Sequence, residues 1–468
     1  MMNIMTMWLP DPASITRPAY RSLARAVVAA IDSGALRPGD RLPTHRELAF
    51  RLGLSVQTVS RAYEALIRAD VIAGEVGRGT YVKSTGPDGR APPYQRLEGD
   101  EPVVDCSMLM PVLGEPHRTA LDRALADLSG DVPSEVLGSF RPRRALRKHV
   151  ERARGWLSLC GIDARPDRIL PTNGATPAMT VALLSAAAPG DLVVTEVLGH
   201  HTLKSLTQLH GLKLEGLACD VQGILPEALD RAARKRGARV LYVLPSGNNA
   251  CAATMDAERR AEIVAVARRH DMLIVENDAW GPLEPRRPAP LAMLAPERVF
   301  YFTALSKCLM PALRTGWLVV PDSHVTAAFS RHMVTNWMAS PLVAELSARL
   351  IERGEALELL RWQRRALARR NIIARQLLDG LDMAGGAHGL HVWLTLSDGW
   401  DEAGFVRSAR LRGVAIAPGS AFETGNSRPR PQGVRICLGA PDERGLRDAL
   451  TVIARLARNR PEPDFLTL

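Results

Sequence analysis

The sequence lacks the features that mark secreted, membrane-spanning and zinc-binding chains. No apolar run is long enough to span a bilayer, since stretches such as 181–188 end at Pro189 and Gly190. Residues 1–9 are apolar but have neither the basic start nor the small-residue cleavage site of a signal peptide. The six cysteines are scattered without a Cys-x-x-Cys pair, which argues against a disulfide framework and a zinc site. We therefore expect a soluble, cytoplasmic protein with no membrane segment and no metal.

Lysine is also scarce, at six of the 60 basic residues, and this leaves six candidates for any chemistry that needs an amine. The chain has 468 residues, of which 46% are hydrophobic and 24% charged, the balance of an ordinary globular protein. This length exceeds what one hydrophobic core serves, so we expect two or three domains. The formal net charge of +10 permits nucleic-acid binding without establishing it.

A stretch rich in proline and glycine separates two parts of the chain. Residues 84–102 contain four prolines and three glycines, and these cannot propagate a helix or a central strand. We predict a linker here. It would join a domain at 1–83 to a domain at 103–468, whose size suits a large α/β unit.

The first domain has the pattern of a helix-turn-helix followed by a hairpin. Residues 19–32 carry apolar side chains at helical spacing. Thr44 and Glu47 form a capping box, in which each satisfies the other's backbone N–H, at the start of a short helix. Ser55 then caps a second helix, and residues 71–82 predict a two-stranded wing with a glycine-rich tip. Together these elements predict a winged helix-turn-helix.

The second helix of such a motif enters the major groove with its N-terminal residues facing the base edges. Gln57 can read adenine through two hydrogen bonds, and Arg61 can contact guanine or phosphate. A small helical interaction module with a solvated arginine face is the alternative, which the coincidence of signals disfavours. The residues expected to contact DNA are Arg46 (backbone), Ser55 and Thr58 (phosphates), Gln57, Arg61, and the wing residues Arg78 (minor groove), Gly79 and Thr80.

The second domain alternates short apolar runs with helical segments from residue 168 onward. Runs that are apolar on both faces predict a buried parallel sheet with helices on each side. Ligands of such open sheets lie beyond the carboxyl ends of the strands. The predicted strands are 191–197, 214–219, 240–244, 273–276, 299–303 and 317–320, and the predicted helices are 177–188, 226–236 and 257–270.

Of the six lysines, Lys307 alone lies where a ligand is expected, directly after a predicted strand. A lysine amine at a strand end can form an imine with an aldehyde cofactor, of which pyridoxal 5'-phosphate is the obvious one. Its phosphate can be held by hydroxyls, a guanidinium and the free N–H groups of a helix start. The residues that offer these groups are Thr303, Ser306, Arg314 and the stretch Gly174-Ala175-Thr176.

The N-terminal motifs resemble a known DNA-binding family. Residues 36–49 read Leu-Arg-Pro-Gly-Asp-Arg-Leu-Pro-Thr-His-Arg-Glu-Leu-Ala and resemble the start of a GntR-type winged helix-turn-helix. Residues 58–63 (Thr-Val-Ser-Arg-Ala-Tyr) and 77–82 (Gly-Arg-Gly-Thr-Tyr-Val) continue the resemblance. Val56 departs from it, because this family commonly places an arginine after the helix-capping serine. That departure leaves Gln57 as the expected base reader.

The order of the cofactor residues resembles fold-type I aminotransferases, and almost the whole chain resembles MocR-type regulators of the GntR superfamily. The resemblance implies an imine at Lys307, phosphate binding by Arg314, and a homodimer in which one chain's DNA-binding domain packs on the partner's large domain. The other positions that it implies are Asn249 beside the cofactor's phenolic oxygen, Arg435 for an amino acid's carboxylate, His200 stacked on the ring, and Asn277, Asp278 and Trp280 for the usual aspartate–tyrosine pair.

Several of these positions depart from the family, and one of them, Asn277, argues against an active enzyme. For His200 and Trp280, ordinary packing is an interpretation nearly equal to a cofactor contact. A carboxylate beside the pyridine nitrogen keeps that nitrogen protonated, so that the ring can accept electrons. If Asn277 faces the nitrogen, a neutral amide weakens this effect, and we expect feeble or no transamination. The register stays open, because a bulge can turn the carboxylate of Asp278 inward.

The sequence therefore predicts a transcriptional regulator that responds to pyridoxal phosphate or to an amine. Ligand binding is expected to shift an equilibrium between dimer arrangements with different affinity for an operator. An active aminotransferase with a fused DNA-binding domain is the alternative. A repressor whose large domain has lost the cofactor and serves only dimerisation is a third interpretation.

Overall fold

The computed structural model divides the chain into two compact units, residues 1–95 and 96–468, and each is taken by itself. The predicted linker at 84–102 lies outside the described residues, as do Arg78 and Asn249. The predicted domain ends at 83 and 103 therefore stay predictions. The described residues are 8–12, 15–16, 18–32, 35–36, 39–68, 71–75, 79–82, 103–138, 140, 146–247, 250–397, 399–425 and 430–459.

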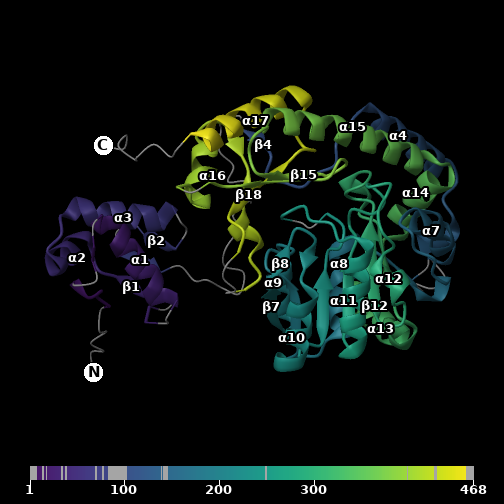
Figure 1. Cartoon of the computed structure of the whole chain (residues 1–468), viewed down its shortest axis with the longest axis horizontal. Coiled ribbons are helices and arrows are strands. Elements are labelled where there is room, and N and C mark those ends of the chain that lie inside the picture. Colours follow the sequence, from purple (N-terminus) through teal and green to yellow (C-terminus); the bar gives the residue numbers. More distant parts are fainter. Residues whose placement is uncertain are drawn as a thin grey trace. The chain divides into compact units, whose positions relative to one another are not determined.

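The N-terminal unit contains helices α1, α2 and α3 (Figure 1). It also contains a small antiparallel sheet of order β1-β3-β2. The predicted two-stranded wing is corrected to three strands, because β1 pairs with β3 through Arg41↔Tyr81 and Leu42↔Thr80. The elements are α1 (Ala19–Asp32), β1 (Arg41–Leu42), α2 (His45–Leu52), α3 (Val56–Arg68), β2 (Ile72–Glu75) and β3 (Gly79–Val82).

Local contacts hold α2 and α3 in place. Thr44 Oγ1 accepts the N–H of Glu47 at 3.3 Å, which is one half of the predicted capping box. The Glu47 carboxylate pairs with Arg51 at 3.0 Å, so the predicted reciprocal half gives way to an ion pair. Tyr63 of α3 is buried, and its hydroxyl donates to the carbonyl of Pro43 at 2.8 Å. The loop before α2 is thereby tied to α3.

The C-terminal unit is built on a seven-stranded sheet of order β5-β13-β12-β11-β10-β6-β7. The pairs from β12 to β7 are parallel, as predicted. β13 is antiparallel to both of its neighbours, so the predicted parallel sheet is corrected to a mixed one. The strands are β5 (Ile169–Thr172), β6 (Leu192–Glu196), β7 (Lys213–Leu217), β10 (Val240–Val243), β11 (Leu273–Asn277), β12 (Val299–Ala304) and β13 (Gly316–Val319).

Helices cover both faces of this sheet, which is why its strands are apolar on both sides. On β10, Val240 packs in the core beneath α8, while the next residue, Leu241, packs with α10 and α11 on the other face. No helix among the described residues is long and apolar enough to cross a membrane. The surrounding helices are α7 (Arg147–Leu159), α8 (Ala175–Ala186), α9 (Leu203–Leu209), α10 (Pro226–Arg236), α11 (Ala257–Arg269), α12 (Leu291–Leu294) and α13 (Val325–Asn336).

A smaller antiparallel sheet of order β14-β15-β18-β17, absent from the sequence prediction, follows near the C-terminus. Figure 1 shows α15 and α17 side by side over it. β4, which follows the linker, pairs with β16 of this part. The remaining elements are β4 (Val104–Asp105), α4 (Glu115–Gly130), α5 (Ser134–Gly138), β8 (Cys219–Asp220), β9 (Gly223–Ile224), α14 (Pro341–Glu352), α15 (Glu355–Leu377), β14 (Met383–Ala384), β15 (His391–Thr395), α16 (Glu402–Arg410), β16 (Val414–Ala415), β17 (Ala417–Pro418), β18 (Gly433–Cys437) and α17 (Glu443–Arg458).

Replacing Glu402 with alanine is expected to destabilise this C-terminal part. The carboxylate is buried at the start of α16, where it accepts the N–H groups of Ser420 at 2.8 Å and Gly433 at 3.0 Å. It also pairs with Arg430 at 2.6 Å. Its loss leaves a guanidinium and two N–H groups without that acceptor, which should lower the free energy of unfolding by about 3–5 kcal/mol. Urea unfolding followed by tryptophan fluorescence measures the change.

Glu443→Ala is the matched control. Glu443 also begins a helix directly after an aspartate N-cap, but its side chain is 47% exposed and pairs with Arg369 at 3.4 Å. An exposed pair of this kind contributes about 0–1 kcal/mol. Equal losses in the two variants would contradict the prediction.

Candidate functional site

Lys307 lies in the turn that follows β12, with its amine largely shielded from water. The amine donates to the carbonyl of Leu109. Burial lowers the pKa of Lys307 to about 8, with Arg435 and Arg314 adding to this effect against an opposing contribution from Cys437. Because the neutral amine is the nucleophile, this lysine is far better prepared for covalent chemistry than an exposed one.

Arg314, Ser306 and Gly174 meet beside this lysine's turn. The Arg314 guanidinium donates to Ser306 Oγ at 3.1 Å and to the Asn173 carbonyl at 3.4 Å. A Cβ at Gly174 would lie 2.7 Å from Arg314 Nη2, so this position admits only glycine without a shift. Ala175 and Thr176 begin α8 here, and the first N–H groups of a helix have no partner within it. The group is a set of donors suited to a phosphate.

Thr303 does not join this group. Its hydroxyl is fully buried on β12, and a Cβ at Gly281 would lie 3.3 Å from it and 3.1 Å from Cys308 Sγ. The predicted phosphate contact of Thr303 is therefore not supported. The reason is the alternation of a strand, which turns Thr303 into the sheet's packing while Ser306, beyond the strand end, reaches Arg314.

His200 follows β6 and lies close to Lys307. Its Nδ1 is 2.9 Å from Thr202 Oγ1, and its ring stacks on His201 at 4.4 Å between centroids. Burial depresses the pKa of His200 well below its usual value, and the charges of Lys307 and Arg435 add to the effect. Burial likewise lowers the pKa of His201 to about 4. Two flat, uncharged rings thus lie beside the lysine at neutral pH, and His201 is a residue that sequence reasoning missed.

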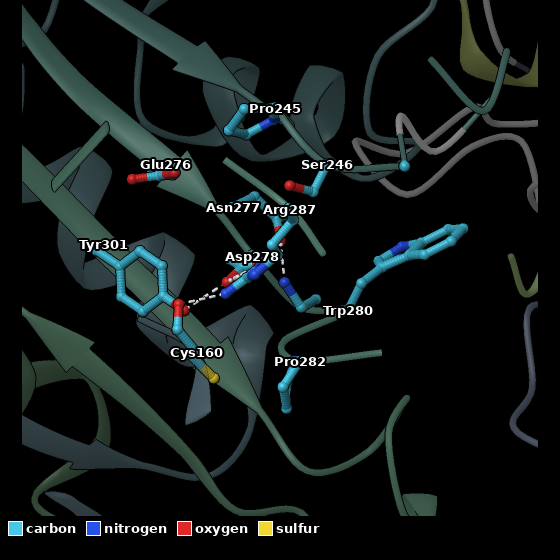
Figure 2. Close-up of polar contacts among 12 residues, drawn as sticks. Cys160, Pro245, Ser246, Glu276, Asn277, Asp278, Trp280, Pro282, Arg287 and Tyr301 are labelled. Atoms are coloured by element: carbon cyan, nitrogen blue, oxygen red, sulfur yellow. Dashed lines mark hydrogen bonds and ion pairs between the residues drawn. The ribbon is translucent and has the colours of Figure 1, made fainter. Parts of the chain in front are cut away.

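Asn277 and Asp278 point in different directions at the end of β11 (Figure 2). The Asn277 amide donates to the Tyr242 hydroxyl at 2.7 Å and accepts the N–H of Ala279 at 3.0 Å. The Asp278 carboxylate accepts two bonds from Arg287 Nη1, at 2.7 and 2.8 Å. Tyr242 lies 6.5 Å from His200 between ring centroids, so Asn277 is linked to the side of the histidines.

A buried polar cluster surrounds Asp278, and sequence reasoning missed it. The Tyr301 hydroxyl donates to Asp278 at 2.5 Å, and Arg287 also donates to the Cys160 carbonyl (Figure 2). Burial raises the pKa of Glu276 to about 7, and the nearby Asp278 adds to this effect. Arg287 and Tyr301 lie 9 and 23 residues from Asp278, and Cys160 lies 127 residues from Arg287, so no short motif could have found the cluster.

Trp280 packs as an ordinary core-edge residue. A Cβ at Gly247 would lie 2.7 Å from its indole ring, and His391 meets the ring edge-on at 5.3 Å. Figure 2 shows the indole turned away from Asn277 and Asp278. These contacts favour the packing interpretation over a cofactor contact for Trp280.

Arg435 brings a second cation toward Lys307 from β18. It is buried, donates to the Ser107 carbonyl at 2.9 Å, and lies over the Phe422 ring at 4.4 Å. Its charge lowers the pKa values of Lys307 and His200, which places it in the same group. An arginine so held is suited to bind a carboxylate.

In the N-terminal unit, the described residues among those predicted to contact DNA fall into three groups. Arg46 and Gln57 are exposed at the starts of α2 and α3. Ser55 and Thr58 are engaged with each other at 2.7 Å, and Arg61 lies 4.6 Å from the centroid of the Tyr20 ring. In the wing, Thr80 is half-buried and a Cβ at Gly79 would lie 2.7 Å from Arg41 Nε.

Known proteins match both units. Residues 143–453 match the family aminotransferase class I and II, and residues 19–82 match bacterial regulatory proteins of the gntR family. The chain belongs to the aminotransferase class I and II family. Joined to a gntR-type domain, this fold has the organisation of a MocR-type regulator.

Two proteins similar to this chain are named as transcriptional regulators, and a solved aminotransferase shares its fold. The chain is 28% identical over 466 residues to the uncharacterized HTH-type transcriptional regulator YdeF of Bacillus subtilis, covering 96% of each. It is 25% identical over 364 residues to the HTH-type pyridoxine biosynthesis transcriptional regulator PdxR of Corynebacterium glutamicum, covering 73% of this chain and 76% of that one. A solved archaeal alanine:glyoxylate aminotransferase shares the fold with a TM-score of 0.70 and 22% identity, over 76% of this chain and 91% of that one.

The amine of Lys307 is expected to become reactive near pH 8. Below that pH it is protonated, and it loses its proton as the pH rises through the lowered pKa. An exposed lysine does so near 10.4. Competitive acetylation at a series of pH values, with peptide mass spectrometry, should give a midpoint of about 8 for Lys307. A midpoint above 10 would contradict the buried environment.

Proposed function

We propose that this chain is a DNA-binding transcriptional regulator whose aminotransferase-like domain binds pyridoxal 5'-phosphate at Lys307 and senses the cofactor or an amino compound. The observation that carries the proposal is one chain that combines a gntR-type helix-turn-helix with a buried lysine beside the Arg314–Gly174 group. Relatives named as transcriptional regulators support it, one of them by a name that refers to pyridoxine biosynthesis.

The described residues fit the cofactor. The missing Cβ of Gly174 lets a guanidinium lie against the start of α8, which gives the donors that a phosphate requires. The amine of Lys307 is partly neutral near pH 7 and can make the covalent link. When bound, the cofactor supplies a reactive aldehyde and an electron-accepting ring. His200 and His201 offer uncharged flat surfaces beside it.

Arg435 gives the same site a place for the carboxylate of an amino-acid effector. We further propose that the chain acts as a homodimer on an operator in the cytoplasm. The ligand then shifts an equilibrium between two arrangements, and it must bind them with different affinity for the shift to occur.

An active aminotransferase is the second candidate, and the family match favours it. The amide of Asn277 disfavours an active aminotransferase, because it carries no negative charge and already donates a hydrogen bond to the Tyr242 hydroxyl. Asp278 does not supply the charge in its place, since its carboxylate is paired with Arg287. A large domain that has lost the cofactor is disfavoured by the retained Lys307 and Arg314.

Lys307→Ala is expected to abolish cofactor attachment while leaving DNA binding in place, because the variant lacks the amine and keeps the N-terminal domain. The wild type should show visible absorbance with pyridoxal phosphate and retain the label after borohydride reduction. The cofactor should change its operator affinity by about 5- to 150-fold, the usual range of coupling between sites. Absorbance, mass spectrometry and fluorescence anisotropy measure the three effects.

Lys204→Ala is the control, because Lys204 is exposed on α9 and does not belong to the group formed by Arg314, Ser306 and Gly174. Its DNA binding should weaken with salt like that of the wild type, because residues 1–83 carry 11 basic against 7 acidic side chains. A borohydride-fixed cofactor in Lys307→Ala would refute the lysine assignment. If the full-length protein does not bind genomic DNA at low salt, the proposed regulatory function is refuted.

Asn277→Asp is expected to speed half-transamination by about tenfold or more, as a change of one or two units in the pKa of a ring nitrogen would. The added carboxylate favours a protonated ring, which the neutral amide does not. Asp278→Asn should instead lower stability, because it leaves Arg287 buried without its anion. Conversion of the bound cofactor by excess amino acid is followed by absorbance. Rapid turnover in the wild type with no gain in Asn277→Asp would contradict the prediction.

A further inference from the structure

The first two residues of α3 present a surface without charge. Val56 begins the helix and is 46% exposed, and Gln57 is exposed beside it. Residues at the start of the second helix of a helix-turn-helix face the base edges in the major groove. A partly exposed valine at such a position has apolar surface to bury, and only an apolar group on a base can cover it favourably.

The neighbouring polar side chains have other partners. Ser55 Oγ accepts the N–H of Thr58 at 3.0 Å and lies 2.7 Å from Thr58 Oγ1, so both hydroxyls belong to the helix cap. Arg61, which is exposed one turn further along α3, has its guanidinium over the Tyr20 ring of α1 at 4.6 Å. Val56 and Gln57 are therefore the residues of the first turn of α3 whose side chains are left to face the bases.

We propose that Val56 and Gln57 read adenine–thymine pairs, Val56 through the 5-methyl group of thymine and Gln57 through N6 and N7 of adenine. Thymine alone among the four bases carries a methyl group in the major groove. Valine has no donor for the O6 and N7 acceptors of guanine, which arginine or lysine recognises. The inference rests on the proposed DNA-binding function and names the class of sequence that the domain selects.

The test uses the full-length protein and a duplex selected from a random library. Each thymine of the selected duplex is replaced in turn by deoxyuridine, which removes only the methyl group. At one position the wild type should lose affinity by roughly fourfold, the effect of one buried methyl. Val56→Ala should bind thymine and deoxyuridine duplexes about equally there. Val56→Arg should select a guanine–cytosine pair at that position.

Gln57 is tested in the same way with 7-deazaadenine, which removes the N7 acceptor. The loss seen with the wild type at one adenine should disappear in Gln57→Ala. Ile67→Ala is the matched control, because Ile67 is also an exposed aliphatic residue of α3, at 46%, but lies toward the other end of the helix. It should keep the wild-type response to both modified bases, and circular dichroism checks that every variant is folded.

The outcomes separate the inference from the function on which it rests. Selection of a duplex without adenine–thymine pairs, or a deoxyuridine effect that persists in Val56→Ala, overturns the inference and leaves DNA binding standing. A full-length protein that binds no duplex at low salt overturns the proposed function, and the inference falls with it.

Discussion

The close approach of a guanidinium to the backbone at the start of α8 is the contact on which the proposed cofactor site depends. A Cβ at Gly174 would lie only 2.7 Å from Arg314 Nη2, so a side chain at position 174 would push the arginine away. Arg314 itself has a φ of 42°, a left-handed conformation that destabilises a non-glycine residue by about 1–3 kcal/mol. The strain lies where β12 turns back into β13, and that turn brings Ser306, Lys307 and Arg314 together.

The alternation of side chains along the strands decides which residues reach this site. Asn277 and Asp278 are neighbours, yet one bonds to Tyr242 and the other to Arg287 and Tyr301. A carboxylate one residue away is therefore no substitute for one at 277. The same geometry keeps Thr303 apart from the Arg314–Gly174 group of donors and leaves Ser306 in it. In the proposed function, Lys307, Arg314 and Ser306 would hold the cofactor, while the carboxylate of Asp278 is paired with Arg287.

Local features of the chain could be predicted from its sequence, and contacts between distant segments could not. Helix α1 lies where its apolar spacing predicts it, and the Thr44 and Ser55 caps form as expected, because each depends on residues one turn apart. The predicted parallel direction of β13 is wrong, because a short apolar run carries no information about the direction of its partner strand. The contact of Arg287 with Cys160 and the pairing of β4 with β16 join segments far apart in sequence, and no local motif indicates them.

Two of the three cations of the site, Lys307 and Arg435, bond to the same short segment. Lys307 donates to the carbonyl of Leu109, and Arg435 donates to that of Ser107. This segment follows β4, the first strand after the predicted linker. A cofactor that bound to Lys307, or a carboxylate that bound to Arg435, would compete with these carbonyls for the same donors. In the proposed function, ligand binding would therefore compete with the hydrogen bonds that hold the segment after β4, because both draw on Lys307 and Arg435.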